Sequence, residues 1–176
     1  MKKKIIKWIV IISAFYIFVT LTIISPSLLM GKSMYPTYPN EGITLTYKLV
    51  YPVLLEKIGL LHNQIERFDI VYLKSNDGNR MAKRVIGLPG ETISCSNEKV
   101  YINGNLVKEK YLETDYVKKI RESHSFTGKI EKIKLKENEY FVMGDNRYKS
   151  TDSRIYGPVK LSQIYGIMSE KYIRIG

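Results

Sequence analysis

The stretch Val100-Tyr101-Ile102-Asn103-Gly104-Asn105-Leu106-Val107 sets the fold class of this 176-residue chain. Two apolar runs flank the dipeptide Asn103-Gly104. A type I′ turn needs positive φ at both central residues, and Asn-Gly is the pair that best tolerates this. The stretch therefore predicts a tight antiparallel hairpin.

Short runs typical of β-strands lie on both sides of this hairpin, and turn residues such as Leu88-Pro89-Gly90 separate them. Many short strands divided by turns predict a mainly β body, either a folded antiparallel sheet or a barrel-like fold. The predicted strands are Ile43–Lys48, Phe68–Lys74, Met81–Leu88, Thr92–Cys95, Val100–Ile102, Tyr140–Gly144, Gln163–Met168 and Lys171–Ile175.

Two segments interrupt this pattern. Leu49–Leu61 is unusually apolar for a connection, and it is either a short core helix or a surface segment that touches lipid; we favour the core helix. Lys108–Glu139 is charged and shows no clear period, so we expect an irregular loop or insertion there.

The N-terminal thirty residues predict a membrane anchor. Trp8 to Gly31 contains 24 residues without a charge. A helix from about Ile5 to Ser25 would be roughly 31 Å long, close to the thickness of the bilayer hydrocarbon. We expect Pro26 to end this helix. The sequence thus predicts a lysine-rich tip and transmembrane helix over residues 1–30, followed by a β-rich domain over residues 31–176.

The lysines before this span predict its orientation, because cytoplasmic flanks carry the excess of positive charge. Lys2, Lys3, Lys4 and Lys7 precede the apolar run, so we expect a cytoplasmic N-terminus and an extracytoplasmic domain at the plasma membrane. A cleavable signal peptide is the alternative. Its apolar region would be shorter, and Ser25-Pro26-Ser27 is a poor cleavage site.

Composition narrows the function classes. The net charge of +11 suits anionic lipid or nucleic acid. No arginine-rich cluster is interleaved with aromatic residues, so we expect no nucleic-acid partner. Cys95 is the single cysteine, which excludes an intramolecular disulfide and a cysteine-based zinc site. We expect no metal and no cofactor.

The two histidines do not point to a Ser–His–Asp triad. His62 follows an apolar run and His124 lies in a polar Ser-His-Ser stretch. Neither lies in a Gly-x-Ser-x-Gly or His-Glu-x-x-His motif, so we interpret both as surface or structural residues. A hydrolase built from this chain needs a different base.

Three clusters of residues carry the chemistry instead. They are Ser33-Met34-Tyr35-Pro36-Thr37, Lys83-Arg84-Val85-Ile86-Gly87-Leu88-Pro89-Gly90-Glu91, and Gly144-Asp145-Asn146-Arg147 with Ser150, Asp152-Ser153-Arg154 and Gly157. In this order, and behind an anchor, these clusters resemble bacterial type I signal peptidase; the mitochondrial inner-membrane processing peptidases share the pattern. Phe68-Asp69-Ile70-Val71 is similar to the family's Gly-Asp-Ile-Val strand, with Phe68 in place of the glycine.

The resemblance implies a serine protease with Ser33 as nucleophile and Lys83 as general base. A free lysine has a pKa of about 10.4, so only about one in 2,500 is neutral at pH 7, and desolvation lowers that pKa. Strand alternation puts Lys83 on the same face as Met81 and Val85, in an apolar setting.

The resemblance also assigns supporting roles. Ser150 matches the serine that orients the lysine, and the charged residues Arg84, Asp145, Asp152 and Arg154 match the scaffold around the site. The backbone N–H of Ser33 is one expected oxyanion donor. Some members of the family add a serine hydroxyl two residues before the nucleophile, where this chain has Gly31. The second donor is therefore open.

The expected substrates are secretory preproteins, bound as extended strands and cut after their signal peptides. Ser33 lies a few residues beyond the predicted span, which places the nucleophile near the outer membrane surface. The expected partners are these preproteins and a bilayer with anionic lipids, and a monomer is the default. The alternatives are a self-cleaving Ser–Lys protease, a catalytically silent anchored scaffold and a basic membrane protein that binds nucleic acid.

Overall fold

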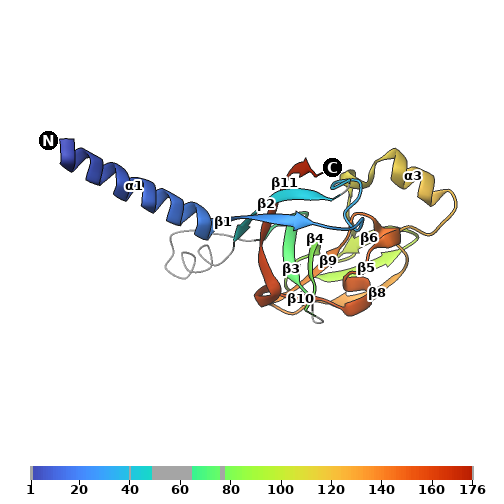
Figure 1. The fold of residues 1–176 in the computed structure, drawn as a ribbon. Helices are drawn as coiled ribbons and strands as arrows, with labels where there is room; N and C mark the ends of the chain where they lie inside the picture. Colours follow the sequence, from blue (N-terminus) through green and yellow to red (C-terminus); the bar gives the residue numbers. More distant parts are fainter. Residues whose placement is uncertain (1, 40, 49–64, 76–77, 176) are drawn as a thin grey trace.

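The computed structural model describes residues 2–39, 41–48, 65–75 and 78–175. An N-terminal helix, α1 (Lys2–Ile23), projects away from a body made of two antiparallel sheets (Figure 1). The prediction of a mainly β fold is confirmed. The strands are β1 (Ile24–Leu29), β2 (Gly42–Lys48), β3 (Ile70–Lys74), β4 (Arg80–Gly87), β5 (Thr92–Ser96), β6 (Lys99–Ile102), β7 (Asn105–Leu106), β8 (Ile130–Lys134), β9 (Glu139–Met143), β10 (Val159–Lys160) and β11 (Ile164–Arg174).

The first sheet has the strand order β1-β2-β11-β3-β4-β9-β10 and curls into a half-barrel. Its long strand β11 includes most of Gln163–Met168 and of Lys171–Ile175, which were predicted as separate strands. The register with β2 shifts between Met168 and Tyr172, so one bulged strand occupies the place of the two predicted ones.

The second sheet has the order β7-β6-β5-β8 and contains the predicted hairpin. Ile102 pairs with Asn105 across the turn. Asn103 has φ of 51° and Gly104 has φ of 82°, as a type I′ turn requires. The hairpin prediction is confirmed.

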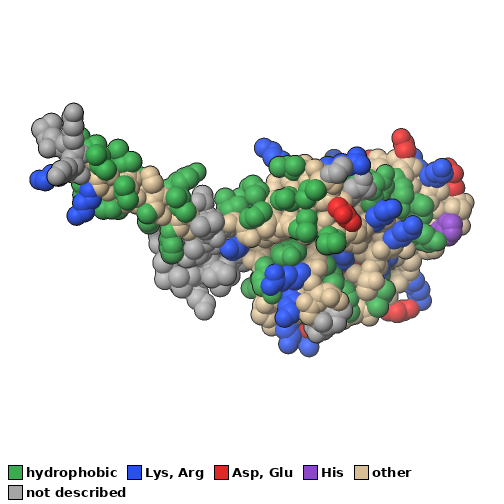
Figure 2. All heavy atoms as spheres, in the orientation of Figure 1, with side chains coloured by type: hydrophobic (Ala, Val, Ile, Leu, Met, Phe, Trp, Pro, Cys, Tyr) green, Lys and Arg blue, Asp and Glu red, His purple; other side chains and the backbone are tan. Residues whose placement is uncertain are grey.

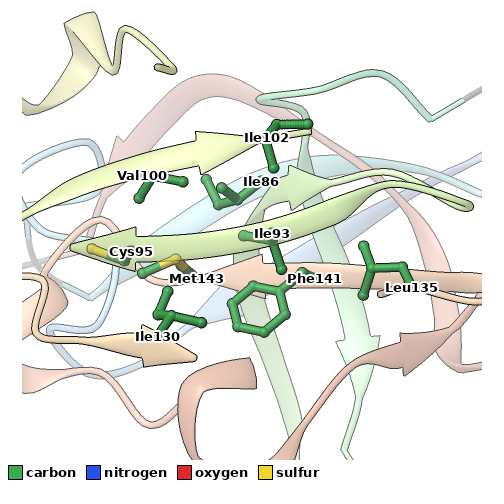
Figure 3. Close-up of a cluster of buried hydrophobic side chains, with 9 residues drawn as sticks. All are labelled: Ile86, Ile93, Cys95, Val100, Ile102, Ile130, Leu135, Phe141 and Met143. Carbon is green, nitrogen blue, oxygen red and sulfur yellow. The ribbon is translucent and has the colours of Figure 1, made fainter. Parts of the chain in front are cut away.

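A shared apolar core joins the two sheets (Figure 3). Ile86, Phe141 and Met143 from β4 and β9 meet Ile93 and Val100 from β5 and β6. Each such side chain contributes about 1.5–3 kcal/mol when it is fully buried. The single cysteine, Cys95, is part of this cluster, so its role in the fold is packing.

Helix α1 ends earlier than predicted. It stops at Ile23, and Ser25 and Pro26 belong to β1. Pro26 pairs with Leu45 of β2, and β1 is an edge strand, where a residue without an N–H is tolerated. The prediction that Pro26 ends the helix was wrong, since the helix ends at Ile23. Proline is tolerated in β1 because this strand lies at the edge of the sheet.

Within the described residues, no helix has both the length and the apolar character that crossing a membrane requires. The predicted transmembrane span is therefore not confirmed. The described side chains of α1 are nonetheless exposed over Lys4–Phe18, and Figure 2 shows hydrophobic side chains along this projecting helix, with basic ones near its outer end.

The prediction of an irregular segment at Lys108–Glu139 was wrong. This segment contains the 3-10 helix η1 (Lys110–Leu112), helix α3 (Asp115–Arg121) and strand β8. The Thr114 side chain caps α3 by accepting a hydrogen bond from Val117 N at 3.3 Å. Elements this short contain too few turns for a period to show in the sequence. The predicted core helix at Leu49–Leu61 lies outside the described residues.

Phe68 has a backbone conformation that normally requires glycine. Its φ is 78°, in the left-handed region. The family that the motifs resemble has glycine at this position. Such a conformation costs a non-glycine residue about 1–2 kcal/mol. A hydrogen bond from Phe68 N to Val85 O at 2.8 Å and an edge contact of the ring with Tyr111 hold it in place.

Candidate active site

Ser33 lies in the tight turn that follows β1. Tyr35 N donates to Lys32 O at 3.2 Å and Tyr38 N donates to Met34 O at 2.9 Å, which closes the turn on both sides of the serine. The side chains of Met34 and Tyr38 are buried in the core beneath it. The turn therefore holds the serine at the surface while its neighbours anchor it.

Lys83 reaches this serine from β4. Its Nζ lies 2.9 Å from Ser33 Oγ and also donates to Ala82 O at 3.1 Å. The residue is only 2% exposed. Burial lowers the pKa of Lys83 to about 8, and Arg154 adds to this, although Asp152 and Asp145 pull it upward. At pH 7 about one in ten of these lysines is thus neutral, against about one in 2,500 for a free lysine.

The turn of residues 32–38 is called the nucleophile turn below, because it contains the predicted nucleophile Ser33. The segment after β9 holds this turn from the other side. Asn146 N donates to Ser33 O at 3.0 Å, and Asn146 Nδ2 donates to Lys32 O at 3.0 Å. Gly144 lies against the same turn, because a Cβ added there would be 2.5 Å from Ser33 O. Only a residue without a side chain fits at this position.

Ser150 lies beside Gly144, close to the nucleophile turn. A Cβ at Gly144 would be 2.2 Å from Ser150 Oγ. This hydroxyl is buried, and in the described part of the chain it has no well-oriented hydrogen-bond partner. Lys83 Nζ bonds to Ser33 and Ala82, so the structure brings Ser150 near the nucleophile turn without a bond to the lysine.

Arg84 and Asp145 form a buried bidentate ion pair behind Ser33 and Lys83, the predicted catalytic dyad. Arg84 Nε donates to Asp145 Oδ1 at 2.8 Å and Arg84 Nη2 to Asp145 Oδ2 at 2.7 Å. Thr37 Oγ1 donates to Asp145 Oδ2 at 2.5 Å. The pair therefore ties β4, the segment after β9 and the end of the nucleophile turn together.

Asp152 and Arg154 form a second bidentate ion pair. Arg154 Nε and Nη2 donate to the two Asp152 oxygens at 2.8 Å each, and Asp152 Oδ2 also accepts from Gly144 N at 2.9 Å. Burial opposes the charge on Asp152, but the bonds from Arg154 and Gly144 hold its pKa below the usual value. Arg154 also donates to Ser150 O at 3.2 Å, so this pair shapes the loop that contains Ser150.

Several side chains without a predicted role also contact this scaffold. Arg147 is buried and pairs with Glu109, and its Nη2 also donates to Tyr111 Oη at 2.8 Å. Tyr116 Oη donates to Asn146 Oδ1 at 3.1 Å. Glu109, Tyr111 and Tyr116 come from the segment expected to be irregular. Asn146 and Arg147 belong to the third motif, which is the only feature of the sequence that could have indicated these contacts.

His124 is not part of this arrangement. His124 is exposed and contacts Ser123 and Tyr148, and His62 lies outside the described residues. Among the residues that the structure describes, no group of histidine, cysteine or acidic side chains could hold a metal ion.

The Ser33 backbone N–H, the expected oxyanion donor, makes no hydrogen bond to any described residue. Gly31 precedes it with φ of 91°, and a Cβ added to this glycine would meet no described atom within 4 Å. The N–H is thus available to an oxygen atom that approaches Ser33.

Two open strand edges flank the dyad. β1 pairs with β2 alone among the described strands, and β4 pairs with β9 only from Arg84 onward. Residues Arg80–Lys83 therefore have an unpaired edge opposite their contact with β3. Unpaired backbone groups of this kind can add an extended peptide as a further strand.

Comparisons with known proteins agree with this geometry. Residues 2–173 match the family model described as signal peptidase, peptidase S26. Signal peptidase I V of Bacillus subtilis is 35% identical over 147 residues, covering 79% of this chain and 86% of the relative. Signal peptidase I S of the same organism is 36% identical over 162 residues, covering 87% and 80%.

A solved structure is similar as well. The crystal structure of a signal peptidase I from Enterococcus faecalis aligns with a TM-score of 0.57 and 34% sequence identity. The alignment covers 62% of this chain and all of the crystallised chain.

Proposed function

This chain belongs to the signal peptidase family, peptidase S26, and is a serine endopeptidase that removes signal peptides, and we propose that Ser33 is its nucleophile and Lys83 its general base. The observation that carries the proposal is the 2.9 Å contact between Lys83 Nζ and Ser33 Oγ, made by a lysine that is almost fully buried. A serine hydroxyl becomes an effective nucleophile when such a base takes its proton.

The proposed reaction has two stages. The neutral Lys83 amine takes the proton from Ser33 Oγ as that oxygen bonds to the scissile carbonyl carbon. The Ser33 N–H donates to the resulting oxyanion. The ammonium then gives its proton to the leaving amine as the carbon–nitrogen bond breaks, which leaves an ester on Ser33. Water, deprotonated by the same lysine, hydrolyses this ester and restores the free serine.

The remaining predicted residues act by positioning. We propose that Arg84–Asp145 and Asp152–Arg154 fix the two segments that meet at the dyad, since both pairs are buried and bidentate. Ser150 is proposed to orient Lys83 when the active site is occupied by substrate. Its buried hydroxyl without a well-oriented partner beside the nucleophile turn supports this role.

We propose that the N-terminal segment holds the catalytic body at the bilayer, with the N-terminus cytoplasmic and the body outside. The exposed apolar side chains of α1 support this, and so does an exposed apolar face on the adjoining strands, formed by Leu28, Ile43 and Ile173 in one row. The positive charge of the chain favours anionic lipids. One copy suffices for catalysis, because both dyad residues come from one chain.

Cleavage of a purified preprotein by the detergent-solubilised chain tests the dyad. Wild type is expected to release the signal peptide, while Ser33→Ala and Lys83→Ala lose at least about 10³-fold in kcat/KM, since each removes one of two groups that act as a unit. Exposed Lys132, on β8, supplies the control variant Lys132→Ala with wild-type activity. Cleavage by folded Ser33→Ala at the wild-type rate would overturn the assignment.

A further inference from the structure

The side chain of Tyr111, on the 3-10 helix η1, lies between two buried arginines of the active-site scaffold. Its ring faces the guanidinium of Arg84, whose Cζ lies 4.2 Å from the ring centroid. Its hydroxyl accepts a hydrogen bond from Arg147 Nη2 at 2.8 Å and donates one to Glu109 Oε1 at 2.6 Å. One side chain from outside the three sequence motifs thus contacts both arginines.

The two arginines hold the same short segment, residues 144–147 after β9. Arg84 reaches it from β4 through the bidentate pair with Asp145. Arg147 belongs to the segment itself, and its Nε donates to Gly144 O at 3.1 Å. A side chain that contacts both guanidinium groups therefore acts on this segment at two points.

This segment bears directly on the nucleophile turn. Asn146 N donates to Ser33 O at 3.0 Å, so a displacement of residues 144–147 also moves the turn. Arg84 is the chain neighbour of Lys83 in β4, so the guanidinium that faces the tyrosine belongs to the strand of the proposed base. Catalysis is sensitive to such shifts, since a misplacement of 1 Å can reduce the rate by about 10²-fold.

The charges around the tyrosine are balanced and largely removed from water. Arg84, Arg147 and Asp145 are buried, and the Glu109 side chain is almost so. A buried charge that loses its partner is strongly destabilising, so the four groups depend on their mutual alignment. Burial keeps the pKa of Tyr111 well above its ordinary value, so the hydroxyl retains the proton that it donates to Glu109.

A second aromatic residue supports the ring from its edge. The rings of Phe68 and Tyr111 pack edge-on with their centroids 5.5 Å apart, and Phe68 O accepts a hydrogen bond from Arg84 Nη1 at 2.8 Å. Glycine, the residue that the family has at position 68, would supply the carbonyl but not the ring contact. The phenylalanine of this chain thus reinforces the position of the tyrosine over the guanidinium.

We propose that Tyr111 is a positioning residue of the catalytic site. Its ring fixes Arg84 and its hydroxyl fixes Arg147, so that one side chain holds residues 144–147 against the nucleophile turn. The inference rests on the proposed function, since it assumes that the chemistry takes place at Ser33.

Packing alone is the competing explanation, because Tyr111 also borders the apolar core that joins the two sheets. Ile133, on β8, is a partly buried residue that borders the same core. Ile133→Ala therefore serves as the matched control for a loss of packing, and it should keep kcat close to the wild-type value.

Kinetics of the full chain in detergent, on a soluble peptide, separate the two parts of this side chain. Tyr111→Phe keeps the ring and removes the hydroxyl, and kcat should fall by at least about fivefold, because hydrogen bonds to charged groups are the stronger ones. Tyr111→Leu also removes the aromatic face, and kcat should fall by at least about thirtyfold. KM should change by less than about twofold in both, because the tyrosine lies on η1 and not on the open strand edges.

The pH profile adds a result that a loss of packing would not produce. Besides burial, three charged groups act on the pKa of Lys83: Asp152, Asp145 and Arg154. Asp145 raises this pKa, and Arg84 neutralises part of its charge. If Tyr111→Leu loosens Arg84, the apparent pKa of the kcat profile should rise above the wild-type value, whereas Tyr111→Phe and Ile133→Ala should keep it.

Amide hydrogen exchange in the Ser33→Ala chain separates this inference from the catalytic proposal. The Asn146 amide, which is bonded to the carbonyl of residue 33, should exchange at least about tenfold faster when Tyr111→Leu is added, whether or not Ser33 is the nucleophile. Unchanged exchange of this amide would overturn the inference. A loss of kcat in Ile133→Ala as large as in Tyr111→Leu would also overturn it, because packing alone would then explain the effect. Wild-type kcat in Tyr111→Phe would overturn it even if Tyr111→Leu failed to fold.

Discussion

Among single residues, the proposed general base, Lys83, has a shifted pKa that makes its role testable. Burial lowers the pKa of Lys83 from 10.5 to about 8, and a base acts only when it is neutral. We therefore expect kcat/KM on a soluble peptide to rise with pH through an apparent pKa of about 8 and to level off above it. A flat profile between pH 6 and 10 would contradict this expectation.

The same lysine should reduce the stability of the fold at neutral pH. Between about pH 8 and 10.5 the unfolded chain holds a proton on Lys83 that the folded chain has lost, so the free energy of unfolding rises with pH across that window. Below pH 8 the buried charge costs about 3 kcal/mol. Lys83→Met should therefore increase the free energy of unfolding at pH 7 by up to about 3 kcal/mol.

Urea unfolding at pH 7 and pH 10.5 measures this effect. The gain from Lys83→Met should shrink at the higher pH, where the wild-type lysine is largely neutral in the folded state and half neutral in the unfolded chain. Lys132→Met changes an exposed lysine of β8 and should alter stability little at either pH. An equal gain at both pH values would mean that packing, and not charge, is responsible.

Among the elements, helix α3 supports the nucleophile turn through one asparagine. Tyr116 of α3 donates to Asn146, which donates in turn to Lys32 O, and the Tyr116 ring packs edge-on against Tyr35 at 4.5 Å. This chain of contacts links a segment remote in sequence to the residues on either side of Ser33.

Asn146→Ala should therefore lower kcat by about threefold to tenfold, because one neutral hydrogen bond contributes about 0.5–1.5 kcal/mol. Tyr116→Phe should have a smaller effect of the same kind. In both variants KM and the apparent pKa of the pH profile should stay unchanged, since neither residue touches Lys83. Tyr101→Phe, on β6, is the control with wild-type kcat. A shifted pH profile in Asn146→Ala would place its effect on the base instead.

In the molecule as a whole, we expect the projecting helix and the β body to have separate tasks. α1 extends away from the sheets in Figure 1, and the cores are built from residues after it. Removal of residues 2–23 should leave cleavage of a soluble peptide within about twofold of the full chain, because the dyad and its scaffold all follow Ile23.

The same truncation should lower the rate on a preprotein embedded in vesicles by at least about tenfold, since it removes the effective concentration that shared attachment to the bilayer provides. The ratio of the two rates, measured in one preparation, is the informative quantity. Equal losses on both substrates would indicate that α1 is needed for folding of the body.

Local patterns in the sequence were enough to predict the β class, the turn at Asn103-Gly104 and most strand positions, because strand periodicity and turn chemistry are local properties. The motifs also contained every residue of the proposed dyad and its scaffold. The predictions failed at Pro26, placed at a helix end when it lies in an edge strand, and at α3 and β8, where elements of five to seven residues show too little period.

Only the tertiary structure decides which residues that are distant in sequence come into contact. The 2.9 Å contact between Ser33 and Lys83 and the pairing of Arg147 with Glu109 each join segments separated by at least thirty-eight positions. Such contacts depend on the curl of the first sheet and on the packing of its core against the second. No local pattern encodes them, because the free energy that fixes them comes from burial summed over the whole body.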